Sequence, residues 1–561
     1  MMETTFTYDH YYDWQEMSSC LKQLAESYPQ LMKLESICVS EEGKDVWAVT
    51  LTDSSIKAAD EKPAYYIDGN HHAGEVTGSM AAMHTVDTLC TYFNKDKKVT
   101  DLLQKYTFYV IPKISPDGSD TYLHTAERLR SVNRPYPNKE LCDGLHPGDL
   151  DGDGVIRTMR VKSLYGAWKE STEDPMVMVK RTPFDVEGDF YNVYPEGEIQ
   201  NYDGLHVKMA PEKWGLDFNR NYPFGWFTEV RQPGAGKYPL SNAENKAVVD
   251  FVLAHKNIGF VSTLHTTGGV LVYPPGTYPE AQALAKDMSL YKNVGKMAKE
   301  IMGYETVNVF DGFLTDIVNY SSGAFDDWCY ETQGIPAYTI ELWNLLERAG
   351  CDTSWPRREK SDEVQAKEYA LTLKWIRENI GEEAIKPWTK FDHPQLGEVE
   401  IGGYNYKFIH QNPPTNYLLQ EVEKTTQFMI ENAYALPKVC IDKVDVKALG
   451  EGIYEVAAVV GNSGYMPTYL TQSAQRQKVD KPVMATLSGA EVVHGEAAMK
   501  VGHLEGVSGV KTSYGYQGLT TANHDPQFKK VTWLVKGQAN DVVTIKVTSE
   551  KAGQAEVQVQ L

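Results

Sequence analysis

Cysteine is scarce in this chain of 561 residues: seven are present, an odd number, and no two of them have the C-x-x-C spacing. The absence of that spacing argues against thiolate zinc sites and thioredoxin-like redox chemistry. The seven cysteines are scattered along the chain. Their pattern therefore indicates no particular redox compartment.

Long apolar runs and an excess of positive charge are also missing. No run approaches the roughly 20 residues that span a bilayer. The chain has 55 Lys and Arg against 76 Asp and Glu, a formal net charge of -21, which argues against nucleic acid or an anionic membrane surface as a partner. The first residues contain no basic n-region and no apolar h-region, so the sequence shows no targeting signal.

What is present is a hydrophobic content of 42% and a length that exceeds one ordinary domain. Helical and strand patterns alternate within residues 1–400, which predicts an α/β domain with a doubly wound mixed sheet and ligands at the carboxyl ends of its strands. Residues 401–436 are predicted to be a connecting segment with an amphipathic helix. Short β-rich runs between Gly, Asn, Asp and Pro predict an all-β sandwich over residues 437–561.

The most informative motif follows the β-rich run 65–68, where His72 and Glu75 stand three residues apart before an amphipathic helical pattern. An imidazole and a carboxylate at such a strand-to-helix turn can both reach one Zn²⁺ ion. His71 competes with His72, but the residue three positions after His71 is Gly74, which offers no ligand. A turn-capping histidine and a glutamate favoured by the helix dipole are the alternative interpretation.

A third ligand is expected at the end of another strand, far along the chain. The apolar, β-branched run 259–264 ends in His265. His72, Glu75 and His265 would leave a fourth coordination position for water, which is typical of catalytic zinc rather than of a closed structural site.

Six motifs, taken in order, resemble those of the zinc carboxypeptidases of the carboxypeptidase A/B family. The resemblance extends over roughly residues 1–390. The motifs are GNHHAGE at 69–75, SPDG at 115–118 with Arg130 following, GLDFNRN at 215–221, TLH at 263–265, NYSSG at 319–323 and YTIEL at 338–342. The resemblance implies a zinc-dependent peptidase that acts on peptides with a free C-terminus. We also expect a secreted or periplasmic protein whose signal peptide is not part of this sequence.

Two further residues are candidates for the chemistry of hydrolysis. A carboxylate near the zinc-bound water must take its proton and pass it to the leaving amine, and Glu341 stands where the family has its general base. Arg130 lies at the family's offset for the arginine that stabilises the oxyanion. Arg128 and Arg134 are close enough in the chain to compete for that role.

The resemblance also implies a clamp for the terminal carboxylate of the substrate, formed by Asn219, Arg220 and Tyr320. A guanidinium with an adjacent amide can hold a carboxylate through bidentate hydrogen bonds. A surface ion pair is the alternative for Arg220, and an ordinary loop aromatic is the alternative for Tyr320. Asp217 matches the carboxylate that orients the free nitrogen of His72.

Side-chain preference depends on Asp326, which falls where enzymes with basic preference have an aspartate. A buried carboxylate at the floor of a pocket would select Lys or Arg by charge. The loop between Tyr320 and Trp328 is one residue shorter than the usual pattern. Two solvent-facing aspartates, Asp326 and Asp327, are the alternative interpretation.

Residues 135–212 are an insertion relative to the compact family pattern, and we expect them to fold over the active-site face and narrow the access of substrates. Asp149, Asp151 and Asp153 resemble the first half of a calcium loop. Arg160 occupies the position of the glutamate that completes an EF-hand, so a solvated Asx-rich turn competes with a Ca²⁺ site.

The sequence therefore predicts a zinc-dependent carboxypeptidase with Glu341 as general base and a preference for basic C-terminal residues. Three alternatives remain open on the same scaffold. They are a peptidase for cell-wall muropeptides, an N-acyl amino acid amidohydrolase and a non-catalytic peptide-binding protein.

Overall fold

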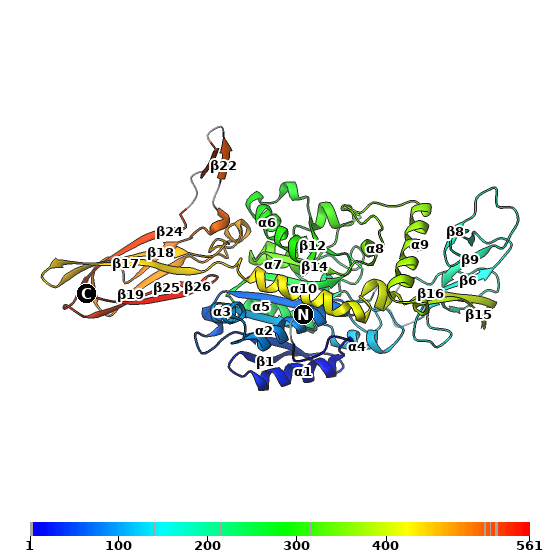
Figure 1. Ribbon diagram of the computed structural model, residues 1–561, viewed down its shortest axis with the longest axis horizontal. Helices are drawn as coiled ribbons and strands as arrows, with labels where there is room; N and C mark the ends of the chain where they lie inside the picture. The colour runs from blue at the N-terminus through cyan, green and yellow to red at the C-terminus, as the bar shows by residue number, and fades with distance from the viewer. Residues whose placement is uncertain are drawn as a thin grey trace.

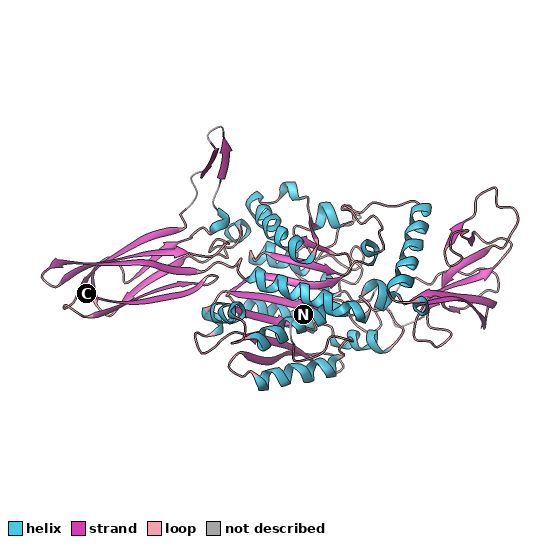
Figure 2. Cartoon of the chain, viewed as in Figure 1, coloured by secondary structure: helices cyan, strands magenta, loops and turns pink. Residues whose placement is uncertain are grey.

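The computed structural model describes residues 4–137, 141–211, 215–314, 316–509, 512–515, 518–521 and 526–561. A central α/β body lies between two outlying groups of β-strands (Figure 1; Figure 2). The inserted segment contributes to one of these groups, and the C-terminal part of the chain forms the other.

The central body is built on a mixed sheet of eight strands in the order β1-β2-β4-β3-β11-β14-β12-β13. Strands β4, β3, β11 and β14 run parallel. β1 pairs antiparallel with β2, β2 with β4, and β12 with β14, whereas β12 and β13 pair parallel. Every residue of β3, β4, β11 and β14 is buried, as expected for parallel strands covered on both faces. The predicted doubly wound mixed sheet is confirmed. The strands are β1 (Met32–Val39), β2 (Asp45–Leu51), β3 (Ala64–Gly69), β4 (Thr107–Ile111), β11 (Ile258–Thr266), β12 (Val270–Tyr273), β13 (Glu305–Asn308) and β14 (Ala337–Leu342).

Helices surround this sheet, and α2 is the one that determines the position of the site. Sixteen of its seventeen residues are buried. A Cβ at Gly78 would lie 2.4 Å from the carbonyl oxygen of Leu264, so only glycine lets α2 approach β11 this closely. The helices are α1 (Trp14–Ser27), α2 (Val76–Tyr92), α3 (Lys97–Lys105), α4 (Pro116–His124), α5 (Ala243–Ala254), α6 (Ala285–Met302), α7 (Phe325–Gln333), α8 (Leu345–Arg348), α9 (Asp362–Asn379) and α10 (Thr415–Ala433).

The inserted segment joins a later part of the chain in a second sheet of six strands, in the order β15-β16-β6-β9-β7-β8. The pairing of β6 with β16 connects residues about 240 positions apart, such as Arg160 and Glu400. The predicted end of the catalytic domain, residue 400, falls within β16. The domain boundaries stay predictions. The strands are β5 (Gly144–Pro147), which pairs with β10 (Gly197–Gln200), β6 (Thr158–Lys162), β7 (Trp168–Glu170), β8 (Met178–Lys180), β9 (Tyr191–Pro195), β15 (Ile385–His393) and β16 (Gly397–Tyr404).

The C-terminal part forms two antiparallel sheets of four strands, β17-β18-β24-β20 and β21-β19-β25-β26. Val456 and Trp533 from the first sheet share one hydrophobic cluster with Ile545 and Val547 from the second, so the sheets pack face to face. The predicted all-β architecture is confirmed. Its elements are β17 (Val439–Gly450), β18 (Ile453–Asn462), α11 (Gln472–Gln477), β19 (Val483–Ser488), β20 (Glu491–His494), β21 (Ala498–Gly502), β22 (Thr512–Gly515), β23 (Gly518–Thr521), β24 (Phe528–Lys536), β25 (Val542–Ser549) and β26 (Gly553–Gln560).

The C-terminal part is attached to the α/β body through buried and partly buried polar contacts. Thr471 donates a hydrogen bond to the carbonyl oxygen of Gly334 at 2.7 Å, and Lys551 donates one to that of Ile258 at 2.9 Å. Arg476 pairs with Glu331 of α7 at 2.6 Å. Within the described ranges, no helix is long and apolar enough to cross a membrane.

Candidate active site

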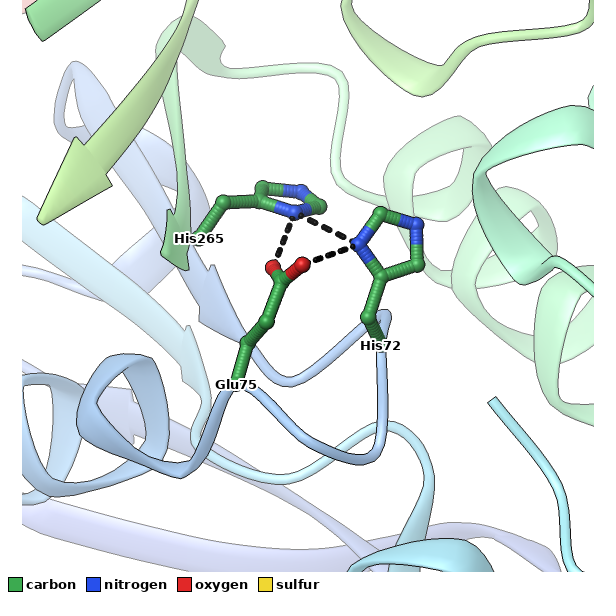
Figure 3. Close-up of side chains that lie close together, drawn as sticks. All are labelled: His72, Glu75 and His265. Carbon is green, nitrogen blue, oxygen red and sulfur yellow. Dashed lines mark hydrogen bonds and ion pairs between the residues drawn. The ribbon is translucent and has the colours of Figure 1, made fainter. Parts of the chain in front are cut away.

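The three predicted ligands meet at the carboxyl ends of two neighbouring parallel strands. His72 and Glu75 lie in the turn between β3 and α2, and His265 lies near the end of β11. The Nδ1 atoms of His72 and His265 each lie 2.8 Å from an oxygen of Glu75 and 3.1 Å from one another (Figure 3). All three residues are buried.

This geometry fits a zinc ion. Two ring nitrogens and a carboxylate oxygen point at one small space, and their ligand atoms all lie within 4.8 Å of one another. A cation between these buried atoms would satisfy the ring nitrogens and the carboxylate oxygen together. Two imidazole nitrogens and one carboxylate are the donor set of a catalytic zinc site.

Local sequence explains why the first two ligands point inward. Asn70 has a positive φ of 66°, a backbone conformation that asparagine tolerates better than most residues. Its side-chain amide donates to the carbonyl oxygens of His72 at 2.7 Å and Ala73 at 3.1 Å. These bonds fix the turn, and Glu75 then stands at the N-cap of α2.

The charges around the triad stabilise its ionised carboxylate. Burial alone would raise the pKa of Glu75, but His72 and His265 lie beside the carboxylate and lower this pKa below its usual value. The other ring nitrogen of His72, Nε2, lies 3.0 Å from Asp217. The pKa of Asp217 is also held well below its usual value: burial opposes this, but Arg130 and His72 lie close to the carboxylate.

A buried polar chain behind the metal ligands was not predicted from the sequence. His71 does not join the triad; its Nε2 lies 2.7 Å from the hydroxyl of Tyr222 and its Nδ1 lies 3.1 Å from that of Thr263. Thr263 donates to Asp68 at 2.6 Å and lies 3.3 Å from Nε2 of His265. The two-residue spacing of Thr263 and His265 in a strand places both side chains on one face, and that spacing was the available signal.

Glu341 lies directly beside the triad. It is buried on β14, where it is the register partner of His265 on β11. Burial, with the charge of Glu75 adding to it, raises the pKa of Glu341 to about 8. A divalent cation at the triad would lower this pKa because it favours the charged form. His265, Arg130 and Arg357 also favour that form. Arg357 lies in a loop without a recognisable motif, so no sequence signal selected it.

Among the three candidate arginines, Arg130 lies next to the triad. Its Nε lies 2.8 Å from Asp217 and its Nη1 lies 3.5 Å from Glu75. Burial disfavours its charge, but Asp217 and Glu75 outweigh this effect and raise the pKa of the guanidinium. Arg134 instead pairs with Glu41 at 3.3 Å, and Arg128 lies over the ring of Tyr406. The oxyanion role of Arg130 stays a prediction.

Arg220 is held in place by neutral groups. Its guanidinium donates to the carbonyl oxygen of Asn219 at 2.6 Å and to the hydroxyl of Ser321 at 3.2 Å. Within the part of the chain that the structure describes, no carboxylate forms an ion pair with it. The side-chain oxygen of Asn219 accepts a hydrogen bond from the backbone of Phe325 at 2.8 Å. The surface ion pair considered for Arg220 is therefore not found.

Tyr320 lies in a surface cluster of side chains. Its ring centroid is 6.3 Å from that of Phe227 and 6.2 Å from that of Phe310, and the guanidinium of Arg231 lies 4.5 Å from it. Ser321, the next residue, makes the contact with Arg220. The clamp role of Tyr320 stays a prediction.

Asp326 and Asp327 at the start of α7 are both buried, with exposed fractions of 4% and 2%. The alternative of two solvent-facing aspartates is therefore wrong. Asp326 accepts a hydrogen bond from Thr339 at 3.0 Å. Burial raises its pKa, while His265 and Arg220 are close enough to oppose that shift. Asp327 accepts instead from the backbone of Gly276 at 2.9 Å.

The carboxylates of Asp149, Asp151 and Asp153 lie together in an exposed turn. Asp153 accepts two hydrogen bonds from Arg157, at 2.6 and 2.7 Å, and lies 2.8 Å from Lys386. Asp149 accepts hydrogen bonds from the backbone of Gly152 and Gly154. These contacts fit the Asx-rich turn, and Ca²⁺ binding stays a prediction.

The fold and the converging ligands define an α/β protein with a buried His-Glu-His group of the kind that binds zinc. The family profile described as "Zinc carboxypeptidase" matches residues 17–151 and 165–349, more than half of the chain. This chain belongs to the zinc carboxypeptidase family. Residues 438–560 match a domain of unknown function, DUF8731.

Relatives with this family's name differ in length and in activity. Carboxypeptidase B of Astacus astacus is 31% identical over 344 residues, which are 59% of this chain and 86% of that protein. Carboxypeptidase D of Mus musculus is 28% identical over 109 residues, which are 19% of this chain and 8% of that protein. The inactive metallocarboxypeptidase ECM14 of Blastomyces gilchristii is 29% identical over 150 residues, 26% of this chain and 24% of that protein.

Proposed function

We propose that this protein is a zinc-dependent carboxypeptidase that releases single residues from the free C-terminus of peptides. The position of Arg220 is the observation that supports this most strongly. A partly buried guanidinium near the metal ligands that lacks a carboxylate partner in the described chain fits a carboxylate supplied by the substrate. A substrate without that carboxylate would leave the charge unpaired.

The residues of the site divide the chemistry among them. Zinc bound by His72, Glu75 and His265 would supply Lewis acidity, which acidifies water and polarises a carbonyl. Glu341 accepts a proton from the attacking water and delivers it to the leaving amine nitrogen. The guanidinium of Arg130 stabilises the negative charge that develops on the former carbonyl oxygen.

Other residues position these groups and the substrate. Asp217 lies between Nε2 of His72 and Nε of Arg130, so one carboxylate orients a metal ligand and the oxyanion arginine together. Asn219 and Arg220 hold the terminal carboxylate, with Tyr320 as a further partner. Holding the terminal carboxylate places the last peptide bond of the substrate at the triad and keeps internal peptide bonds away from it.

The direct test compares a peptide that has a free C-terminal acid with the same peptide as its C-terminal amide. Zinc-loaded protein is expected to shorten the free acid by single residues, detected by mass spectrometry, and to leave the amide intact. Removal of zinc by a chelator is the control and should stop the release. Cleavage of both peptides at internal bonds, or of neither, would contradict the proposed function.

A preference for basic residues is proposed from the buried carboxylate of Asp326. Asp326→Asn is expected to lower kcat/KM for a C-terminal Arg substrate relative to a Leu substrate by about 30-fold, because the incoming guanidinium loses its charge partner. Asp327→Asn is the matched control, since its side chain contacts the backbone of Gly276. An unchanged Arg-to-Leu ratio in Asp326→Asn, or loss of the ratio only in Asp327→Asn, would show that Asp326 does not select the side chain.

A further inference from the structure

A cavity of about 1,210 Å³ lies between the loop that follows α4, the inserted segment and the end of β16. Arg130 lines this cavity and also contacts Asp217 and Glu75, so the cavity adjoins the metal site. None of the clamp residues Asn219, Arg220 and Tyr320 is among the described residues that line it. The cavity and the clamp therefore share no residue among those described, while Arg130 belongs to the cavity wall and contacts the metal ligand Glu75.

Part of the wall lies outside the family profile. Ile156 and Arg157 of the inserted segment, Tyr404 at the end of β16 and Tyr406 just after it are not among the residues that match the profile. The pairing of β6 with β16 brings these two segments together. At this volume the cavity exceeds a typical pocket for a small ligand, and it has room for several residues of a peptide.

Arg128 is the cationic side chain in this wall that is available to an acidic ligand; the carboxylate of Glu127 lines the cavity as well. Three other arginines line the cavity, and each has a carboxylate partner: Arg130 with Asp217, Arg134 with Glu41 and Arg157 with Asp153. For Arg128, no ion pair is found in the described ranges. An arginine without a carboxylate partner in the described ranges is notable in a protein with a net charge of -21.

The guanidinium of Arg128 is held in place without being neutralised. It lies 4.4 Å from the ring centroid of Tyr406, and that ring stacks on His410 at 4.8 Å and 16°. Its Nη2 also lies 3.4 Å from the carbonyl oxygen of Ile156. Contacts of this kind restrict the side chain while leaving its donors free for an anion.

We propose that this cavity binds the part of a peptide substrate that lies N-terminal to the cleaved bond, and that Arg128 selects an acidic side chain there. The inference rests on the proposed function, because the clamp and the triad set the direction of the peptide. A chain whose terminal carboxylate lies at Arg220 and whose last peptide bond lies at the triad continues past Arg130 into the cavity. The preferred substrates then carry Asp or Glu upstream of the residue that is released.

The test measures binding, so that it does not depend on hydrolysis. Zinc-loaded protein with Glu341→Gln is titrated into fluorescein-labelled alanine-rich pentapeptides that end in Arg and carry a single Glu, Gln or Lys at each upstream position in turn. Fluorescence anisotropy is expected to show about tenfold tighter binding of Glu than of Lys at one or two of these positions, the worth of one charge-assisted hydrogen bond. Arg128→Glu should reverse that preference and Arg128→Ala should remove it.

Lys162→Glu is the matched control, because it replaces a cation by a glutamate, as Arg128→Glu does. Lys162 lies on β6, pairs with Asp189 and does not line the cavity. It should keep the preference for Glu. Equal binding of Glu and Lys peptides at every position, no binding of any peptide, or a preference that survives Arg128→Glu would overturn the inference. Absence of hydrolysis by the protein with Glu341 intact, with the binding preference kept, would refute the proposed function alone.

Discussion

Glu341→Gln is expected to lower kcat by at least about 100-fold and up to about 10,000-fold, the range that a general acid–base group contributes. The amide keeps the shape of the side chain but cannot accept the proton of the attacking water. Steady-state release of a C-terminal residue from a free-acid peptide is the measurement. KM is expected to change little, because Glu341 acts on the reacting atoms and not on the terminal carboxylate.

The zinc content separates loss of the base from loss of the metal. Glu341→Gln should retain one zinc per chain by elemental analysis, since the triad is formed by other residues. Glu347→Gln, a change of the same kind in the nearby helix α8, serves as the control and should retain activity. Full hydrolysis by zinc-loaded Glu341→Gln would show that another group acts as the base.

Arg220→Ala is expected to abolish the discrimination between a free C-terminal acid and its amide, with a fall in kcat/KM for the free acid of about 100-fold or more. Removing the guanidinium leaves the substrate carboxylate in the site without a charged partner. The loss should appear mainly in KM if the carboxylate is held equally in the ground state and the transition state. Kinetics on the matched acid and amide peptides provide the measurement.

Arg181→Ala is the control for this change, because Arg181 lies in the inserted segment and contacts the ring of Phe190 and nearby backbone carbonyls. It should retain the preference for the free acid. If Arg220→Ala discriminates between acid and amide as strongly as the unchanged protein, Arg220 is not the clamp. Tyr320 and Asn219 would then be the residues to examine for that role.

The metal ligands could be predicted because their signals are local or lie at strand ends. His72 and Glu75 occupy a single turn, and a run of β-branched residues leads directly to His265. The same sequence could not show that Asp326 is buried or that Arg220 has no carboxylate partner among the residues that the structure describes. Both properties depend on groups from distant parts of the chain, such as Thr339 and Ser321.

The inserted segment shows the same limit more strongly. The sequence predicted that residues 135–212 lie over the active-site face, and this stays a prediction; residues of the segment line the cavity beside Arg130. The partner of this segment was not predicted. β6 pairs with β16 about 240 residues later, and an alternating pattern indicates a strand without indicating which strand lies beside it.

The sequence by itself determined the α/β body, the all-β C-terminal part and the ligands of the metal site, because hydrophobic periodicity and ligand spacing are written along the chain. The tertiary structure alone decided which arginines are neutralised, which carboxylates are buried and where a cavity opens. These properties come from contacts between residues far apart in sequence. The free energy of a charge depends on the groups that surround it in space, and those neighbours are set only once the chain has folded.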